Sequence, residues 1–314
     1  MNQGMNHGSS PESPARALTG EPAGCALCAL RSRRLFTRWL AAAPLLPMSG
    51  PTWAQGDPGG VQRDVGKNSR WTKLVPAEDL EASAAQQYQQ LTGEARAQRA
   101  LAGDSHPQVI RLRAIAGSIV PFAPPWNERA KRWKWEVNLL GSKEMNAFCM
   151  PGGKIAFYMG ILQTLQLNDD EVAAIMGHEV AHALREHARE RLAKQLATQG
   201  AVGLGAALLG LGDAGRLAAD LGARLLSLKF SRDDETDADI VGMDLAARSG
   251  FDPAAGVSLW QKMLAASKGA PPKWLSTHPS GEQRINEIRA RLPRVQPLFE
   301  AAPRPPRRFA PPAA

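Results

Sequence analysis

The chain has 314 residues, of which 44% are hydrophobic and 22% charged, so it can bury the core of one large domain or two small ones. Its formal net charge is +8. Residues 1–54 carry five arginines against two glutamates, which leaves +5 on the rest of the chain. This mild surplus is compatible with peripheral contact with an anionic membrane, but it is too small to indicate nucleic-acid binding.

The first 54 residues have the layout of an export signal. A basic stretch, Arg31 to Arg38, precedes an apolar run from Trp39 to Met48, and Thr52-Trp53-Ala54 offers a small-residue cleavage site. The run has about half of the roughly 20 residues that a membrane helix needs. Ser32-Arg33-Arg34-Leu35-Phe36 resembles the twin-arginine export motif, with an ordinary secretory signal as the alternative. We therefore predict a signal peptide over residues 1–54 and a periplasmic location.

The three cysteines do not form a disulfide framework. Cys25 and Cys28 precede the apolar run and should leave with the signal peptide. Cys149 would then be the only thiol of the mature protein. A buried, unreactive core cysteine is favoured there over a reactive one.

The first part of the mature chain is predicted to hold helices and then strands. A linker over residues 55–75 precedes helical compositions from Pro76 to Ala102 and from Gln108 to Val120. Residues 132–139 alternate between apolar and polar side chains, which is typical of a half-buried strand and accounts for the basic and aromatic residues there without a nucleic-acid partner. The apolar positions are Trp133, Trp135, Val137 and Leu139.

Two further strands are predicted over 146–150 and 154–160, on either side of the turn sequence Pro151-Gly152-Gly153. Strands joined by so short a turn form a hairpin, so we expect a small antiparallel sheet.

From Asn168 the chain is predicted to be helical almost to its end. Asn168 caps a helix with an acidic first turn, which should run through two histidines to Leu196. The apolar stretch Ala201 to Gly212 is too short to cross a bilayer, so packing in the core or at an interface is favoured. Further helices are expected near 215–228, 233–248, 253–267 and 280–291, followed by a disordered Pro- and Arg-rich tail over 297–314.

His178-Glu179-Val180-Ala181-His182 carries the chemistry. Residues four apart lie on one helix face, so His178 and His182 can offer both imidazoles to one tetrahedral Zn²⁺. Glu179 lies about 100° round the helix, close to the metal without binding it. Its carboxylate can activate the zinc-bound water as a general base. The alternative is a surface helix with two incidental histidines.

A catalytic zinc needs a third protein ligand. One known pattern places a histidine six residues after His182, but Ala188 stands there, and His187 should face away from the motif as a solvated helix residue. A carboxylate from another helix remains. Glu235 and Asp239 share one face at four-residue spacing, so Glu235 could bind zinc while Asp239 accepts a hydrogen bond from a ligating imidazole. Spacing alone fits an ordinary acidic helix start equally well.

These motifs together resemble metallopeptidase family 48, a gluzincin family that includes CAAX prenyl proteases, HtpX and BepA-like periplasmic peptidases. The resemblance rests on the histidine motif, on Ser231-Arg232 with Glu235-Thr236-Asp237-Ala238-Asp239, and on two further blocks in the same order. These blocks are Asn146-Ala147-Phe148 with Pro151-Gly152-Gly153, and Thr277-His278-Pro279-Ser280 with Arg284. The resemblance implies a mainly helical, zincin-like α+β metallopeptidase domain over residues 76–296. It also implies that the sheet lies beside the zinc helix and that each chain binds one Zn²⁺.

The resemblance also implies roles for single residues. Glu235 is expected as the third zinc ligand, Glu179 as the base, and Asp239 as a catalytic residue beside the site. In the BepA-like branch the histidine that matches His278 can occupy the fourth zinc position and hold the enzyme inactive. Asn146, Ala147 and Arg284 are expected to line the substrate cleft, where a peptide could add as an extra strand.

The sequence therefore predicts an exported zinc endopeptidase that cleaves unfolded or misassembled envelope proteins. One alternative is a chaperone-like assembly factor whose closed zinc site seldom cleaves. The other is a metal-stabilised binding protein without enzymatic activity.

Overall fold

The computed structural model describes residues 60–198, 225–267, 273–278 and 281–313, all within the folded unit Gln55–Ala314. Several predicted features lie outside these residues: the signal peptide, Cys25 and Cys28, the stretch Ala201 to Gly212 and most of the helix predicted near 215–228.

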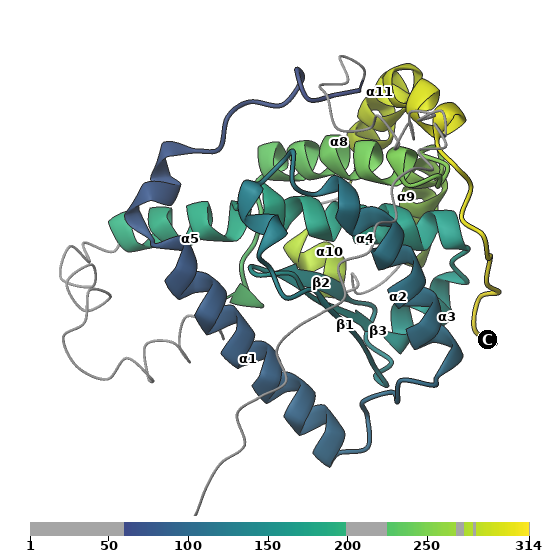
Figure 1. Cartoon of the computed structure of the whole chain (residues 1–314), viewed down its shortest axis with the longest axis horizontal. Helices are drawn as coiled ribbons and strands as arrows, with labels where there is room; N and C mark the ends of the chain where they lie inside the picture. Colours follow the sequence, from purple (N-terminus) through teal and green to yellow (C-terminus); the bar gives the residue numbers. More distant parts are fainter. Residues whose placement is uncertain (1–59, 199–224, 268–272, 279–280, 314) are drawn as a thin grey trace, which may run out of the picture. The chain divides into compact units, whose positions relative to one another are not determined.

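Helices predominate, as predicted, and a small sheet lies beside the histidine-bearing helix (Figure 1). The α-helices are α1 (Ala77–Ala97), α2 (Pro107–Ile119), α3 (Met159–Leu165), α4 (Asp169–Leu184), α5 (His187–Thr198), α8 (Arg232–Arg248), α9 (Ala255–Ala266), α10 (Lys273–Thr277) and α11 (Glu282–Ala301). Short 3₁₀ turns are η1 (Arg70–Leu74), η2 (Val120–Phe122) and η3 (Glu128–Lys131).

The sheet has three strands, β1 (Glu136–Leu140), β2 (Ala147–Met150) and β3 (Lys154–Tyr158), in the order β1-β3-β2. β2 and β3 form the predicted antiparallel hairpin, but β1 pairs with β3 in parallel, so the prediction of a wholly antiparallel sheet was wrong. Every residue of β3 is buried, whereas β2 has two half-buried residues. A strand covered on both faces belongs in the centre of a sheet, and here β3 separates the two strands that precede it in the chain.

The two helices that carry the predicted site begin with well-formed caps. Asn168 and Glu171 make a reciprocal capping box at the start of α4, and Ser231 and Asp234 make one at the start of α8. α4 and α8 form the most extensive helix–helix contact in the described part of the chain, and they lie side by side in Figure 1. This contact places the histidines of α4 opposite the acidic residues of α8.

The helix predicted to continue from Asn168 to Leu196 is broken. α4 ends at Leu184 and α5 begins at His187, because Glu186 adopts a left-handed backbone conformation with φ = 58°. A left-handed residue cannot continue a right-handed helix. The break redirects the chain after α4, with direct consequences for His187.

The ordered fold extends on both sides of the predicted domain limits 76 and 296. Val61, in the predicted linker, is fully buried in the main core. At the other end α11 continues to Ala301, and the backbone N–H of Phe309 donates to the carboxylate of Asp169 at the start of α4. The residues from 297 to 313 are therefore helical and then extended against the domain rather than disordered. In the described part of the chain, no helix is both long and apolar enough to cross a membrane.

Candidate metal centre

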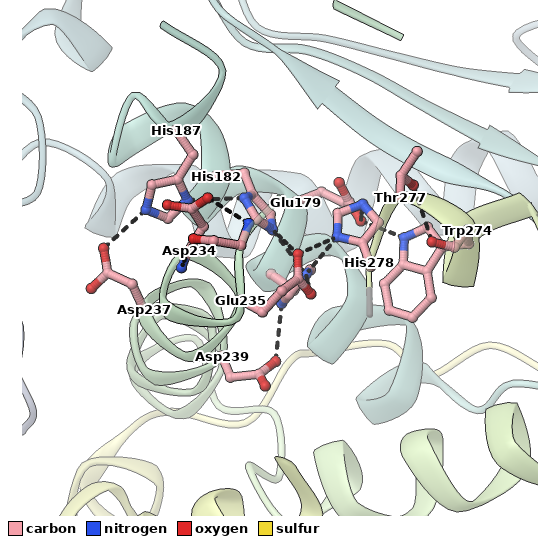
Figure 2. Close-up of polar contacts among 12 residues, drawn as sticks. Glu179, His182, His187, Asp234, Glu235, Asp237, Asp239, Trp274, Thr277 and His278 are labelled. Atoms are coloured by element: carbon pink, nitrogen blue, oxygen red, sulfur yellow. Dashed lines mark hydrogen bonds and ion pairs between the residues drawn. The ribbon is translucent and has the colours of Figure 1, made fainter. Parts of the chain in front are cut away.

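Four ligand atoms converge between α4 and α8. His178 and His182 come from α4, Glu235 comes from the first turn of α8, and His278 directly follows α10. One nitrogen or oxygen of each lies within 4.8 Å of the others, and all four side chains are buried. Figure 2 shows His182, Glu235 and His278 pointing toward one another. The predicted ligands His178, His182 and Glu235 are thus brought together, and His278 joins them at the fourth position.

The spacing of these atoms is close to that of a tetrahedral zinc site, with two of the four separations given below slightly shorter. Zinc binds nitrogen and oxygen ligands at about 2.0–2.2 Å, which places tetrahedral ligand atoms about 3.3–3.6 Å apart. His178 Nε2 lies 3.1 Å from His182 Nε2 and 3.3 Å from His278 Nδ1. Glu235 Oε1 lies 3.4 Å from His182 Nε2 and 2.9 Å from His278 Nδ1. Three imidazoles and a carboxylate are also a donor set that suits zinc.

Glu179 lies beside this cluster without joining it. Its side chain is buried, and its Oε1 accepts a 2.6 Å hydrogen bond from the indole N–H of Trp274 and lies 3.7 Å from His278 Nε2. Trp274 belongs to α10 and stacks on His278. One short segment of chain therefore contacts both the predicted base and the predicted fourth ligand.

Asp239 orients the ring of His178. Its Oδ1 lies 3.0 Å from His178 Nδ1, so the ring can donate there while Nε2 faces the cluster. Arg284 donates to both oxygens of Asp239 and to Oε2 of Glu235, and its guanidinium lies 3.7 Å from the centre of the Trp260 ring. The prediction that Arg284 lines the substrate cleft was therefore wrong: it is buried behind the ligands as a structural counter-charge.

The prediction for His187 was also wrong. Because the chain turns at Glu186, His187 is buried rather than solvated, and its Nδ1 lies 2.9 Å from Nδ1 of His182. Its Nε2 lies 3.1 Å from Oδ2 of Asp237 (Figure 2). The same oxygen also accepts a hydrogen bond from Arg185.

Burial and neighbouring charges shift the pKa values of three of the four cluster residues. Burial acts to raise the pKa of Glu235, but the charge of His278 and hydrogen bonds from His182 and His278 outweigh it, so this pKa falls well below its usual value. Burial lowers the pKa of His182 and keeps its ring neutral, as a metal ligand must be. Burial also opposes the charged form of His278, yet Glu179 and Glu235 raise its pKa.

A cleft opens beside the cluster. β2 is an edge strand of the sheet, and the cleft is lined by Asn146 and Ala147 together with Glu179, Thr277 and His278. Ala147 in β2 and Asn146 just before it thus line this cleft beside the candidate base, and their contact with a substrate stays a prediction.

Sequence reasoning missed Trp274, Asp237 and His187. A five-residue helix gives little periodic signal for Trp274, and Asp237 stands inside the acidic block that was inspected for Glu235 and Asp239. The charged segment Arg185 to Arg189 contains neither Gly nor Pro to mark the break that reorients His187.

A histidine pair at four-residue spacing on one helix, completed by a glutamate from a second helix, defines a metallopeptidase of the gluzincin type. Residues 123–292 match the sequence model of peptidase family M48, and the chain belongs to that family.

Named relatives agree with this assignment. The chain is 39% identical over 165 residues to the mitochondrial metalloendopeptidase OMA1 of Schizosaccharomyces pombe, covering 52% of this chain and 48% of that protein. It is 31% identical over 189 residues to the metalloprotease LoiP of Escherichia coli, covering 54% of this chain and 73% of LoiP. It is 29% identical over 170 residues to the β-barrel assembly-enhancing protease of the same organism, covering 51% and 35%. The chain spans about half the length of the yeast OMA1 relative and about a third of the assembly-enhancing protease.

Proposed function

We propose that this protein is an exported zinc-dependent endopeptidase that cleaves unfolded or misassembled envelope proteins. The observation that carries the proposal is the convergence of ligand atoms from His178, His182, Glu235 and His278, with the carboxylate of Glu179 beside them. Membership of peptidase family M48 supports the same activity.

Each side chain has a definite task in peptide hydrolysis. Zinc, when bound, supplies Lewis acidity that polarises the scissile carbonyl and lowers the pKa of a bound water to about 7. Glu179 accepts a proton from the attacking water and passes it to the departing amine, as a general base and then a general acid. The hydrogen bond between His178 and Asp239 holds one ligand ring in place during these steps.

The cleft favours extended substrates. β2 is an edge strand and lines the cleft with Asn146 and Ala147, and an edge strand can bind a peptide through main-chain hydrogen bonds. Such recognition depends little on side chains, so an unfolded segment is a better substrate than a folded surface.

The envelope as the place of action rests on two supports. The first is the signal-like layout of residues 1–54, and the second is the likeness to a protease whose name refers to β-barrel assembly. Other relatives carry mitochondrial names, so compartment does not follow from similarity alone. Fractionation of cells that produce the full chain tests this part: recovery of a processed protein in the periplasm is expected, and a full-length protein in the cytoplasm would contradict it.

A chaperone-like assembly factor with little proteolysis is the second candidate. It is favoured by His278, whose Nδ1 stands at the fourth corner of the cluster, and by Trp274, which holds the carboxylate of Glu179. A site closed in this way has no free position for a substrate carbonyl until the α10 segment moves.

Cleavage of casein and of an unfolded outer-membrane protein separates the candidates. The protease proposal expects cleavage by the wild type, none by Glu179→Gln, and faster cleavage by His278→Ala. If Glu179→Gln retains zinc but supports envelope assembly as well as the wild type, the protein acts without catalysis. If His278→Ala is no more active than the wild type, His278 does not block the site.

A further inference from the structure

We propose that His187 and Asp237 form a relay that positions the zinc ligand His182, and that this relay sets how tightly the site holds zinc. The inference rests on the proposed zinc site and adds two residues to its support. Both act through His182, so they are positioning residues.

The hydrogen bonds of the relay allow one consistent direction of donation. If Nε2 of His182 faces the metal, its Nδ1 carries the proton and donates to Nδ1 of His187 over 2.9 Å. His187 then carries its own proton on Nε2 and donates it to Oδ2 of Asp237 over 3.1 Å. The same oxygen accepts from Arg185, which keeps the carboxylate ionised and in place. Both nitrogens of His187 are thus engaged, so it cannot serve as a further ligand of the same ion.

The relay supplies an orientation that packing alone does not. The ring of His182 stacks on Phe230, with centroids 4.0 Å apart and planes inclined by 29°. Stacking fixes the plane of the ring but leaves a half-turn flip about the Cβ–Cγ bond and the choice of tautomer open. A hydrogen bond at Nδ1 fixes both, and loss of such a partner typically weakens metal affinity 10- to 100-fold.

The two histidine ligands of α4 are supported in parallel ways. His178 donates to Asp239, which is paired with Arg284. His182 reaches Asp237 through His187, and Asp237 is paired with Arg185. Both aspartates belong to α8, as does the ligand Glu235. Each of the two ligands is thus connected by hydrogen bonds to an aspartate of α8 that is paired with an arginine. This repeated arrangement indicates that the contacts of His187 serve metal binding and do more than bury one histidine.

The test measures zinc affinity of the full chain by competition with a fluorescent chelator at fixed pH. His187→Ala is expected to raise the zinc dissociation constant about 10- to 100-fold. His187→Asn places a carbonyl oxygen near the former Nδ1 and should recover most of the loss. Asp237→Ala should weaken binding too, and the double variant should be no weaker than the more affected single variant, because both changes break one chain of bonds. His106→Asn is the matched control, since it replaces a histidine that caps α2 with another good capping residue.

Two further measurements separate positioning from folding. The melting temperature of the metal-free protein should be similar for His187→Asn and wild type, and the d–d spectrum of the Co²⁺-substituted protein should change in His187→Ala but not in His106→Asn. Unchanged zinc affinity in both His187→Ala and Asp237→Ala overturns the relay, as do independent, additive effects. If the wild type itself binds no zinc, the proposed function fails as well. If the wild type binds zinc but the relay variants bind it as tightly as the wild type does, only the relay proposal fails.

Discussion

The contact between α4 and α8 depends on two glycines, and replacing one of them tests how the site is built. A Cβ atom on Gly242 would lie 2.8 Å from the backbone N of His178 and 2.9 Å from the carbonyl carbon of Gly177. A Cβ on Gly177 would lie 2.7 Å from the carbonyl oxygen of Gly242. These neighbours are backbone atoms of a helix, so they cannot rotate away. Ordinary contact begins at 3.4 Å, and Gly242→Ala therefore forces the helices apart by about 0.6 Å or more.

We expect Gly242→Ala to lower both stability and activity. Overpacking costs about 1–3 kcal/mol, with the upper end expected because the clash is with backbone, while the alanine gains about 1 kcal/mol in helix propensity. The net loss in the free energy of unfolding should be about 1–2 kcal/mol. The displacement also moves Glu235, two turns earlier on α8, away from His178. Since a 1 Å misplacement can reduce rates 100-fold, a shift of this size should lower kcat/KM about tenfold.

Gly93→Ala is the matched control. Gly93 is an exposed residue inside α1, and a Cβ there meets nothing within 4 Å. It should gain about 0.5–1 kcal/mol from the same change in helix propensity. Urea denaturation in the presence of a chelator measures both variants, and zinc competition measures the site. If Gly242→Ala is stabilised like Gly93→Ala and keeps its zinc affinity, close helix packing does not set the geometry of the site.

Three more outcomes follow from buried groups. Arg284→Met should destabilise the metal-free protein by about 3–5 kcal/mol in urea denaturation, because it leaves the buried carboxylates of Glu235 and Asp239 without their cation. A loss below about 1 kcal/mol would show that other groups stabilise these two carboxylates. Cys149 is half-buried at the cleft rather than in the core as predicted, yet desolvation first, and then the charge of Glu179, raises the pKa of its thiol. Iodoacetamide at pH 8 should therefore label Cys149 more slowly in the native than in the urea-unfolded protein, as peptide mass spectrometry can show; equal rates would contradict this. Free zinc at 100 times its dissociation constant should add about 2.7 kcal/mol to the free energy of unfolding, reversibly on chelation; an unchanged melting curve would mean that native and unfolded chains bind zinc alike.

The parts of the site that sequence could predict are local. His178, Glu179 and His182 lie within one helical turn, so their mutual placement follows from helix geometry alone. Glu235 and Asp239 also share a face, but spacing does not say which helix they oppose. The resemblance to a known family supplied that pairing, and the structure confirms that these residues meet.

The errors share a cause in non-local structure. β3 is buried along its whole length and pairs in parallel with β1 and antiparallel with β2, and both its cover and its second partner are set by segments outside its own alternation. His187 was misplaced because Glu186 takes a left-handed conformation that side-chain contacts support: its carboxylate pairs with Arg189 and accepts from Asn68. Arg189 is a local partner, but Asn68 is 118 residues away in the chain and so lies outside the pattern from which a helix is predicted.

The structure finally constrains how the site could open. α10 contributes Trp274, which holds Glu179, and His278, at the fourth corner of the cluster, directly follows α10. His278→Ala frees the corner but leaves the indole hydrogen bond on the base, so it should activate cleavage only in part. Trp274→Phe removes that hydrogen bond while keeping an aromatic ring in the stack.

The two changes should therefore reinforce each other. In a double-mutant cycle on kcat/KM, the double variant should exceed the product of the single effects, because either remaining contact keeps α10 over the site. Zinc content and the melting temperature of each variant serve as controls for loss of metal or fold. Multiplicative effects would mean that the fourth corner and the base are released independently, and that α10 does not move as one latch.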